Sequence, residues 1–223
     1  MAKIRRPIQF SWHFGVSPSK LASLGVFDPT LNVDTKLFID PLLLSGSAHP
    51  ELRNGEATYK NFFSEIIKLL NASKAENDIA WRTAYKRLRF REIKGTCLGY
   101  GAASINGSGF GPQLTGKIVR TAKEIVDLGV DDPDLFIALP LLEDDVGPDL
   151  ISDMTTNIIF ADLVSFNDRI INEIKVPAEA FRVNGSDGMF LVNPTSPRRT
   201  PVILVPTDIL RDLPIASDWE DVS

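Results

Sequence analysis

The sequence predicts a single α/β domain with a mixed sheet and about four helices, and α+β is the alternative class. Three observations predict it. Apolar residues recur at three- and four-residue spacing in several stretches, short apolar runs bounded by Gly and Pro are typical of strands, and 43% hydrophobic with 24% charged residues matches a folded protein. We expect the domain to span residues 1–206, and residues 207–223 to be a separate C-terminal segment.

The first third of the chain is expected to hold strands followed by helices. Residues 8–14 are predicted to form a strand, and residues 36–44 (KLFIDPLLL) to begin as one. Because Pro41 cannot donate a hydrogen bond to a sheet, this second strand ends at Asp40. Loop-forming residues and then apolar spacing predict the next three segments: a loop over 45–56 and helices over 57–72 and 75–88.

The glycine-rich segment 95–111 is expected to be irregular. After it, Pro112 suits the first turn of a helix and Gly129 a left-handed stop, which together bound one helix. Residues 135–142 form either a buried strand or a short helix, since periodicity does not distinguish the two. The other predicted elements are a turn at 131–134, a helix over 152–175, a hairpin of 181–183 and 189–192 around the loop 184–188, and a strand over 201–206.

Composition excludes several classes of protein. The single cysteine, Cys97, cannot form an intramolecular disulfide. The first residues carry the positive charge of a signal peptide, but polar residues follow where its apolar stretch should stand. We therefore expect a cytoplasmic protein. The longest apolar run is far shorter than the roughly 20 residues of a membrane helix, so no membrane is expected. A net charge of −5 argues against polyanion binding by the whole surface. With only His13 and His49, histidine-rich zinc sites are excluded.

The acidic segment from Glu143 to Asp153 is the first candidate site, with five carboxylates within eleven residues at the start of a predicted helix. Mg²⁺ prefers such oxygen ligands. We expect Glu143, Asp145 and Asp149 as metal ligands, and Asp149 and Asp153 as catalytic carboxylates. The alternative is a solvated loop in which Asp149, Ser152 or Asp153 caps the helix.

Two strings match the pattern of metal-dependent nucleases, in which carboxylates hold the metal and a lysine polarises the attacking water. Pro148-Asp149 with Glu173-Ile174-Lys175 matches in letters, but Glu173 and Lys175 fall on a predicted helix rather than a strand. Glu92-Ile93-Lys94 lies on a more extended segment and would pair with Asp40. Lys94 is therefore the candidate catalytic lysine.

Residues 111–118 (GPQLTGKI) match the phosphate-binding pattern GxxxxGK but lack the Ser or Thr that binds Mg²⁺. A nucleotide-binding loop of that type is disfavoured. Two other interpretations stay open: amides of Gly107 to Gly111 bind an anion at the following helix start, or the glycines allow close packing.

One dense basic run precedes Lys94. Its aromatic neighbours, Trp81 and Tyr85, have helical spacing typical of a core face, whereas the cations are available for phosphate contacts or form a solvated face. The candidate nucleic-acid or phosphate-binding residues are Arg82, Lys86, Arg87, Arg89 and Arg91.

Three segments together carry a resemblance: residues 37–44 (LFIDPLLL), 108–118 (SGFGPQLTGKI) and 147–159 (GPDLISDMTTNII). The combination resembles a group of uncharacterised bacterial proteins from mobile and defence-associated gene neighbourhoods. The resemblance implies a bacterial or phage source, and it assigns no role to any residue. It also implies that family members continue past this C-terminus, so that residues 207–223 would lead to a further domain. We expect a component of an antiviral defence or mobile-element system that acts on nucleic acid or nucleotide as a Mg²⁺-dependent nuclease or phosphodiesterase. The competing hypothesis is a non-catalytic module that recognises a protein or attaches to a further effector domain, with the tail around Trp219 as a docking or linking segment.

Overall fold

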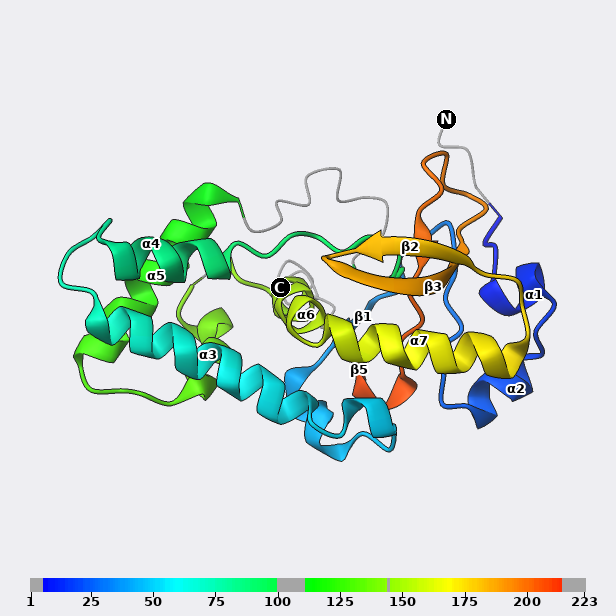
Figure 1. Cartoon of the computed structure of the whole chain (residues 1–223), viewed down its shortest axis with the longest axis horizontal. Coiled ribbons are helices and arrows are strands. Elements are labelled where there is room, and N and C mark those ends of the chain that lie inside the picture. Colours follow the sequence, from blue (N-terminus) through cyan, green and yellow to red (C-terminus); the bar gives the residue numbers. More distant parts are fainter. Residues whose placement is uncertain (1–5, 100–110, 144, 214–223) are drawn as a thin grey trace, which may run out of the picture.

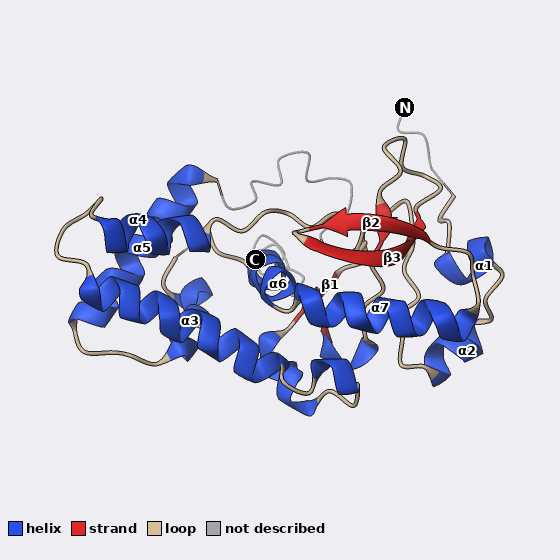
Figure 2. Ribbon diagram, in the orientation of Figure 1, coloured by secondary structure: helices blue, strands red, loops and turns tan. Residues whose placement is uncertain are grey.

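A computed structural model describes residues 6–99, 111–143 and 145–213. It confirms a single domain that mixes helices and strands, and the strands form two small antiparallel sheets instead of one (Figure 2). The helices are α1 (Phe10–Phe14), α2 (Pro18–Ser23), α3 (Gly55–Ala72), α4 (Ile79–Leu88), α5 (Pro112–Asp127), α6 (Pro148–Ile158) and α7 (Phe160–Ile174). The strands are β1 (Leu37–Ile39), β2 (Glu179–Val183), β3 (Ser186–Val192), β4 (Pro201–Val202) and β5 (Leu210–Asp212).

The helices lie in two groups (Figure 1). α3, α4 and α5 gather at one end of the molecule, where their apolar faces form the larger core around Phe63, Ile66 and Phe136. α7 runs beneath the β2–β3 hairpin at the other end, where a second core surrounds Phe10 and Phe166. α6 lies between the two groups, so residues on it are close to both.

The predicted hairpin is confirmed. β2 and β3 pair antiparallel, with Val183 opposite Ser186, and Asn184 and Gly185 connect them with positive φ angles of 47° and 84°. Two positive φ angles identify the turn type that fits the twist of paired strands, and Asn-Gly is the sequence that favours it. The connection is therefore two residues long, shorter than the predicted loop.

Residues 207–213 belong to the expected C-terminal segment, and their placement is specific. β5 pairs antiparallel with β1, with Phe38 opposite Arg211. The amide of Asp40 donates to the carbonyl of Ile209 at 3.0 Å, which extends the contact past the end of β1. Residues 214–223, including Trp219, lie outside the described residues, as do residues 1–5, 100–110 and Asp144.

Two helical predictions are confirmed closely. α3 covers the predicted segment and buries Tyr59, Phe63 and Ile66. α5 begins at Pro112, and Gly129 follows it with a φ of 91°. The hydroxyl of Tyr85 on α4 donates to the carbonyl of Pro112 at 3.0 Å, so the start of α5 is fixed against α4.

Other predictions are wrong at their boundaries or in their type. Residues 10–14, predicted as a strand, form α1, because the amide of Ser11 donates to Asp28 Oδ1 at 2.9 Å and Gly15 ends the turn in the left-handed region. The predicted helix over 152–175 is two helices that meet at Ile159; α6 is seen end-on in Figure 1 while α7 runs across the view. Both helices bury apolar faces, so the apolar spacing continues through the break.

The remaining differences concern short segments. The run 135–142 is neither a strand nor one helix, because Pro140 fixes φ and lacks a backbone donor. The predicted loop 45–56 contains a short 3₁₀ helix that begins at Pro50. The predicted strand at 201–206 is limited to β4, because the next residues bond to other segments: the amide of Ile203 donates to the carbonyl of Gly95, and the amide of Phe27 donates to the carbonyl of Val205. The 3₁₀ helices of the described residues are Pro41–Gly46, Pro50–Leu52, Pro133–Phe136, Leu139–Leu141 and Thr207–Ile209.

Candidate functional site

A pocket of about 600 Å³ opens between the end of α4 and the start of α5. Three of its lining side chains are cationic, and its wall includes the first residues of α5. The lining residues are Lys86, Arg89, Phe90, Arg91, Glu92, Gly111 and Pro112.

The local sequence directs the cations into this pocket. Leu88 and Phe90 are buried in the larger core, whereas Arg89 and Arg91 are exposed. In an extended backbone alternate side chains point to opposite sides, so anchoring Leu88 and Phe90 presents both arginines outward. The side-chain amide of Asn157 on α6 donates to the carbonyl of Arg91 at 2.8 Å and holds this segment against α6.

Glu92 is the carboxylate among the lining residues, and it pairs with Lys94 rather than with the pocket's cations. Within residues 6–99, 111–143 and 145–213, no carboxylate oxygen lies within 4.0 Å of Lys86, Arg89 or Arg91. The start of α5 adds a partial positive charge, because Gly111 offers no side chain to cap the helix. These groups can bind an anion with two or three negatively charged oxygens.

The other two predicted cations are placed differently. Arg87 pairs with Glu65 on α3 at 2.6 Å, and its guanidinium lies 5.0 Å from the centre of the Phe62 ring. Arg82 is exposed on α4 but does not line the pocket. The structure therefore brings together three of the five predicted cations and assigns Arg87 to helix packing.

The predicted metal ligands Glu143 and Asp145 are paired with Lys117 of α5. The ammonium of Lys117 lies 2.7 Å from Glu143 and 3.3 Å from Asp145, and the hydroxyl of Thr121 donates to Glu143. Burial acts to raise the pKa of Glu143, but the hydrogen bonds from Lys117 and Thr121 outweigh it and lower the pKa. Lys117 is the lysine of the GxxxxGK string, so its charge is used within the protein.

Asp149 and Asp153 do not cap α6, contrary to the alternative interpretation of the acidic segment. The helix begins after Gly147, whose missing side chain provides no cap, and Asp149 lies in its first turn. Ser152 also has another role: its hydroxyl accepts a hydrogen bond from the amide of Ile39 at 3.0 Å and connects α6 to β1.

The carboxyl of Asp153 has a raised pKa. Burial, then the charge of Glu92, then that of Asp149 raise it to about 7. Glu92 lines the basic pocket, so part of the negative charge that acts on Asp153 comes from the pocket's wall. Lys94 follows in the same segment, with its ammonium 3.9 Å from Glu92.

Asp34 is a further carboxylate that is affected by Glu92, and no sequence pattern predicted it, because it lies in a polar loop with no motif. Partial burial of its carboxyl and then the charge of Glu92 raise its pKa. Glu92 is thus the carboxylate shared by the surroundings of Asp34 and Asp153. These residues come from three segments that are distant in sequence.

Asp40, the predicted partner of Glu92, has a structural role instead. It is buried, its carboxylate accepts a hydrogen bond from the amide of Leu42 at 2.9 Å, and it pairs with Arg211 of β5 at 2.9 Å. The other nuclease-like string lies on α7 as its letters predicted: Glu173 pairs with Lys20 at 3.6 Å, and Lys175 ends the helix with a φ of 54°.

Two kinds of feature are absent from the described residues: a group of side chains that could hold a metal ion, and a helix that could span a membrane. In that part of the chain, no three His, Cys, Asp or Glu side chains group closely enough to hold a metal ion. No helix there is long and apolar enough to cross a membrane. The idea that Gly107 to Gly111 bind an anion concerns residues outside the described ranges, apart from Gly111.

Comparison with known proteins places the chain in a family. The family model described as "Domain of unknown function (DUF8370)" matches residues 15–218, so the chain belongs to this family. No curated protein and no solved structure gives a significant match. The resemblance of its sequence to an uncharacterised family agrees with this membership.

Proposed function

For this member of the DUF8370 family, we propose that the pocket between α4 and α5 binds phosphate groups of a nucleic acid. The observation that supports the proposal most directly is the set of three cations, Lys86, Arg89 and Arg91, that surround a pocket of about 600 Å³ and form no ion pair with any residue that the structure describes. Arginine is well suited to phosphate because its planar guanidinium donates two parallel hydrogen bonds.

The charge distribution favours a local phosphate site over a general polyanion surface. The chain carries a net charge of −5, so its average surface repels phosphate. Most other cations near this end are paired: Arg87 with Glu65, Arg120 with Glu76 and Lys117 with two carboxylates. The pocket retains its positive charge because its cations lack such partners among the described residues.

Binding of labelled single- and double-stranded oligonucleotides, measured by fluorescence polarisation, tests the proposal. Arg89→Ala and Arg91→Ala are expected to weaken binding several-fold each without changing thermal stability. Arg182→Ala is the matched control, since Arg182 is an exposed arginine on β2 that does not line the pocket. Equal affinities of all three variants and the parent would rule out the pocket as the binding site.

A second candidate function is Mg²⁺-dependent cleavage of phosphodiester bonds at the edge of the same pocket. The supporting observation is that the charge of Glu92, which lines the pocket, helps to raise the pKa of Asp153 to about 7. A carboxyl whose pKa is raised by burial and neighbouring negative charge is stabilised in its ionised form by a bound cation. In this proposal Glu92 and Asp153 would bind Mg²⁺ together with the phosphate oxygens of the substrate, because the described carboxylates form no group of three that could hold the ion alone, and Lys94 would orient the attacking water.

Cleavage and binding are separable by experiment. We expect Asp153→Asn to abolish Mg²⁺-dependent cleavage of an oligonucleotide while leaving its affinity within about twofold. Asp149→Asn is the neighbouring control and is expected to have a smaller effect, because Glu92 contributes more than Asp149 to the perturbation of Asp153. If the parent binds oligonucleotide but cleaves none with Mg²⁺ or Mn²⁺, the catalytic proposal is wrong.

If the parent binds oligonucleotide without cleaving it, the chain acts as a non-catalytic recognition module. The pairing of Glu143 and Asp145 with Lys117 supports this alternative, because it gives these carboxylates a role in packing the loop onto α5. The bacterial defence or mobile-element context, and any protein partner, remain proposals that rest on the resemblance of the three sequence segments.

A further inference from the structure

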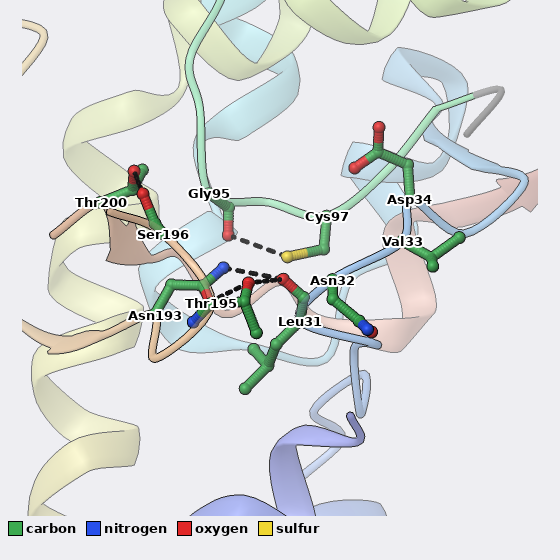
Figure 3. Close-up of a pocket in the computed structure, with 10 residues that line it drawn as sticks. All are labelled: Leu31, Asn32, Val33, Asp34, Gly95, Cys97, Asn193, Thr195, Ser196 and Thr200. Carbon is green, nitrogen blue, oxygen red and sulfur yellow. Dashed lines mark hydrogen bonds between the residues drawn. The ribbon is translucent and has the colours of Figure 1, made fainter. Parts of the chain in front are cut away.

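A second pocket, of about 250 Å³, lies away from the start of α5 and is built from three segments (Figure 3). One wall is the loop 31–34, the second is the stretch 95–97, and the third is the loop after β3. Its lining is mostly polar. The residues are Leu31, Asn32, Val33, Asp34, Gly95, Cys97, Asn193, Thr195, Ser196 and Thr200.

Hydrogen bonds hold the walls of this pocket in place. The side chains of Asn193 and Thr195 both donate to the carbonyl of Leu31, at 2.9 and 3.0 Å (Figure 3). On the other side, the amide of Thr35 donates to the carbonyl of Cys97 at 2.9 Å. The pocket therefore exists before a ligand binds, which lowers the entropic cost of binding.

Gly95 fixes the inner wall. Its φ is 114°, and a Cβ at this position would lie 2.1 Å from the carbonyl oxygen of Pro201. The amide of Ile203 donates to the carbonyl of Gly95 at 2.9 Å. This close approach joins the stretch 95–97 to β4 and needs a residue without a side chain.

The described residues that line the pocket include one carboxylate, that of Asp34, and no cationic side chain. No hydrogen bond or ion pair reaches the carboxylate of Asp34 from any residue that the structure describes, and Figure 3 shows it at the rim. Across the pocket, the hydroxyls of Ser196 and Thr200 bond to each other at 2.5 Å. The nearby charge of Glu92 adds to the negative potential at Asp34. A positively charged donor is the group that this environment favours.

The size of the pocket limits the ligand. At roughly 30 Å³ of liquid volume for each water molecule, 250 Å³ corresponds to about eight waters or one small organic molecule. We propose that this pocket binds a small hydrophilic molecule with a protonated amine, which pairs with Asp34 while the ligand's hydroxyls contact Ser196 and Thr200. The proposal is independent of phosphate binding at α4 and α5.

Two sugars of matched shape test this inference: D-glucosamine and D-glucose, which differ at one position by an amine in place of a hydroxyl. Each is titrated into the ¹⁵N-labelled full chain, at a pH where the amine is protonated, and amide shifts are followed. We expect saturable shifts at Asp34, Cys97 and Ser196 with glucosamine, and at least tenfold weaker binding of glucose. Alkylation of Cys97, the chain's single cysteine, provides a second measurement, since glucosamine at saturation should slow its modification by iodoacetamide.

Asp34→Asn is expected to reduce the affinity for glucosamine to that for glucose without changing the melting temperature. Asp187→Asn, at an exposed carboxylate on β3, controls for general charge and should leave both affinities unchanged. Three results would overturn the inference: no saturable shift with glucosamine, equal affinities for the two sugars in the parent, or an affinity for glucosamine that survives Asp34→Asn.

Discussion

The salt dependence of nucleic-acid binding is the most quantitative consequence of the basic pocket. Each phosphate neutralised by a cation releases counterions, so log affinity falls with log salt concentration by about 0.9 per contact on duplex DNA. Three contacts from Lys86, Arg89 and Arg91 give a slope of about −2.7. Between 50 and 200 mM salt, the affinity should then fall about 40-fold.

Removing one cation should change this slope by one contact. For Arg91→Ala we expect a slope of about −1.8 and a loss of about 12-fold over the same range of salt. On single strands the slopes are smaller, about −2.1 and −1.4, because the charge density is lower. The measurement is fluorescence polarisation at five salt concentrations, with Arg182→Ala expected to reproduce the parent. A parent slope near zero, or an unchanged slope in Arg91→Ala, would refute the assignment of these cations to phosphate.

Three further predictions concern stability, each measured by urea unfolding. The pKa of Asp153 is raised from 3.8 to about 7, so ionisation of this carboxyl destabilises the folded state. As pH rises from about 4 to 7, the parent should therefore lose stability relative to Asp153→Asn. Identical pH profiles of the two proteins would contradict this. Lys117→Met leaves Glu143 buried without its cation and should lower the free energy of unfolding by about 1–3 kcal/mol. The double variant Lys117→Met with Glu143→Gln should recover most of this loss. No recovery would show that the ion pair is unimportant for stability. Gly95→Ala should cost at least about 2 kcal/mol, because it places a methyl group against the carbonyl of Pro201 at positive φ, whereas Gly46→Ala, in open space, should cost far less.

The sequence determined the elements whose signals are local. Residues near one another in the chain determine the apolar stripe of α3, the Pro112 and Gly129 boundaries of α5 and the β2–β3 hairpin. Each of these was predicted correctly, although the hairpin's loop is shorter than predicted. The strand end at Asp40 was also correct, since Pro41 stops the ladder wherever the strand packs.

Tertiary structure decided which charges remain available for function. Lys117 and Glu143 are 26 positions apart, and Glu92 and Asp153 are 61 apart. No spacing rule therefore indicates that Lys117 and Glu143 form an ion pair, or that the charge of Glu92, in the wall of a pocket, acts on Asp153. Asp34 carries no motif at all. Whether a carboxylate or a cation has a partner depends on the packing of α5, α6 and the stretch after α4, because electrostatic interactions act through space and short-range sequence patterns do not record them.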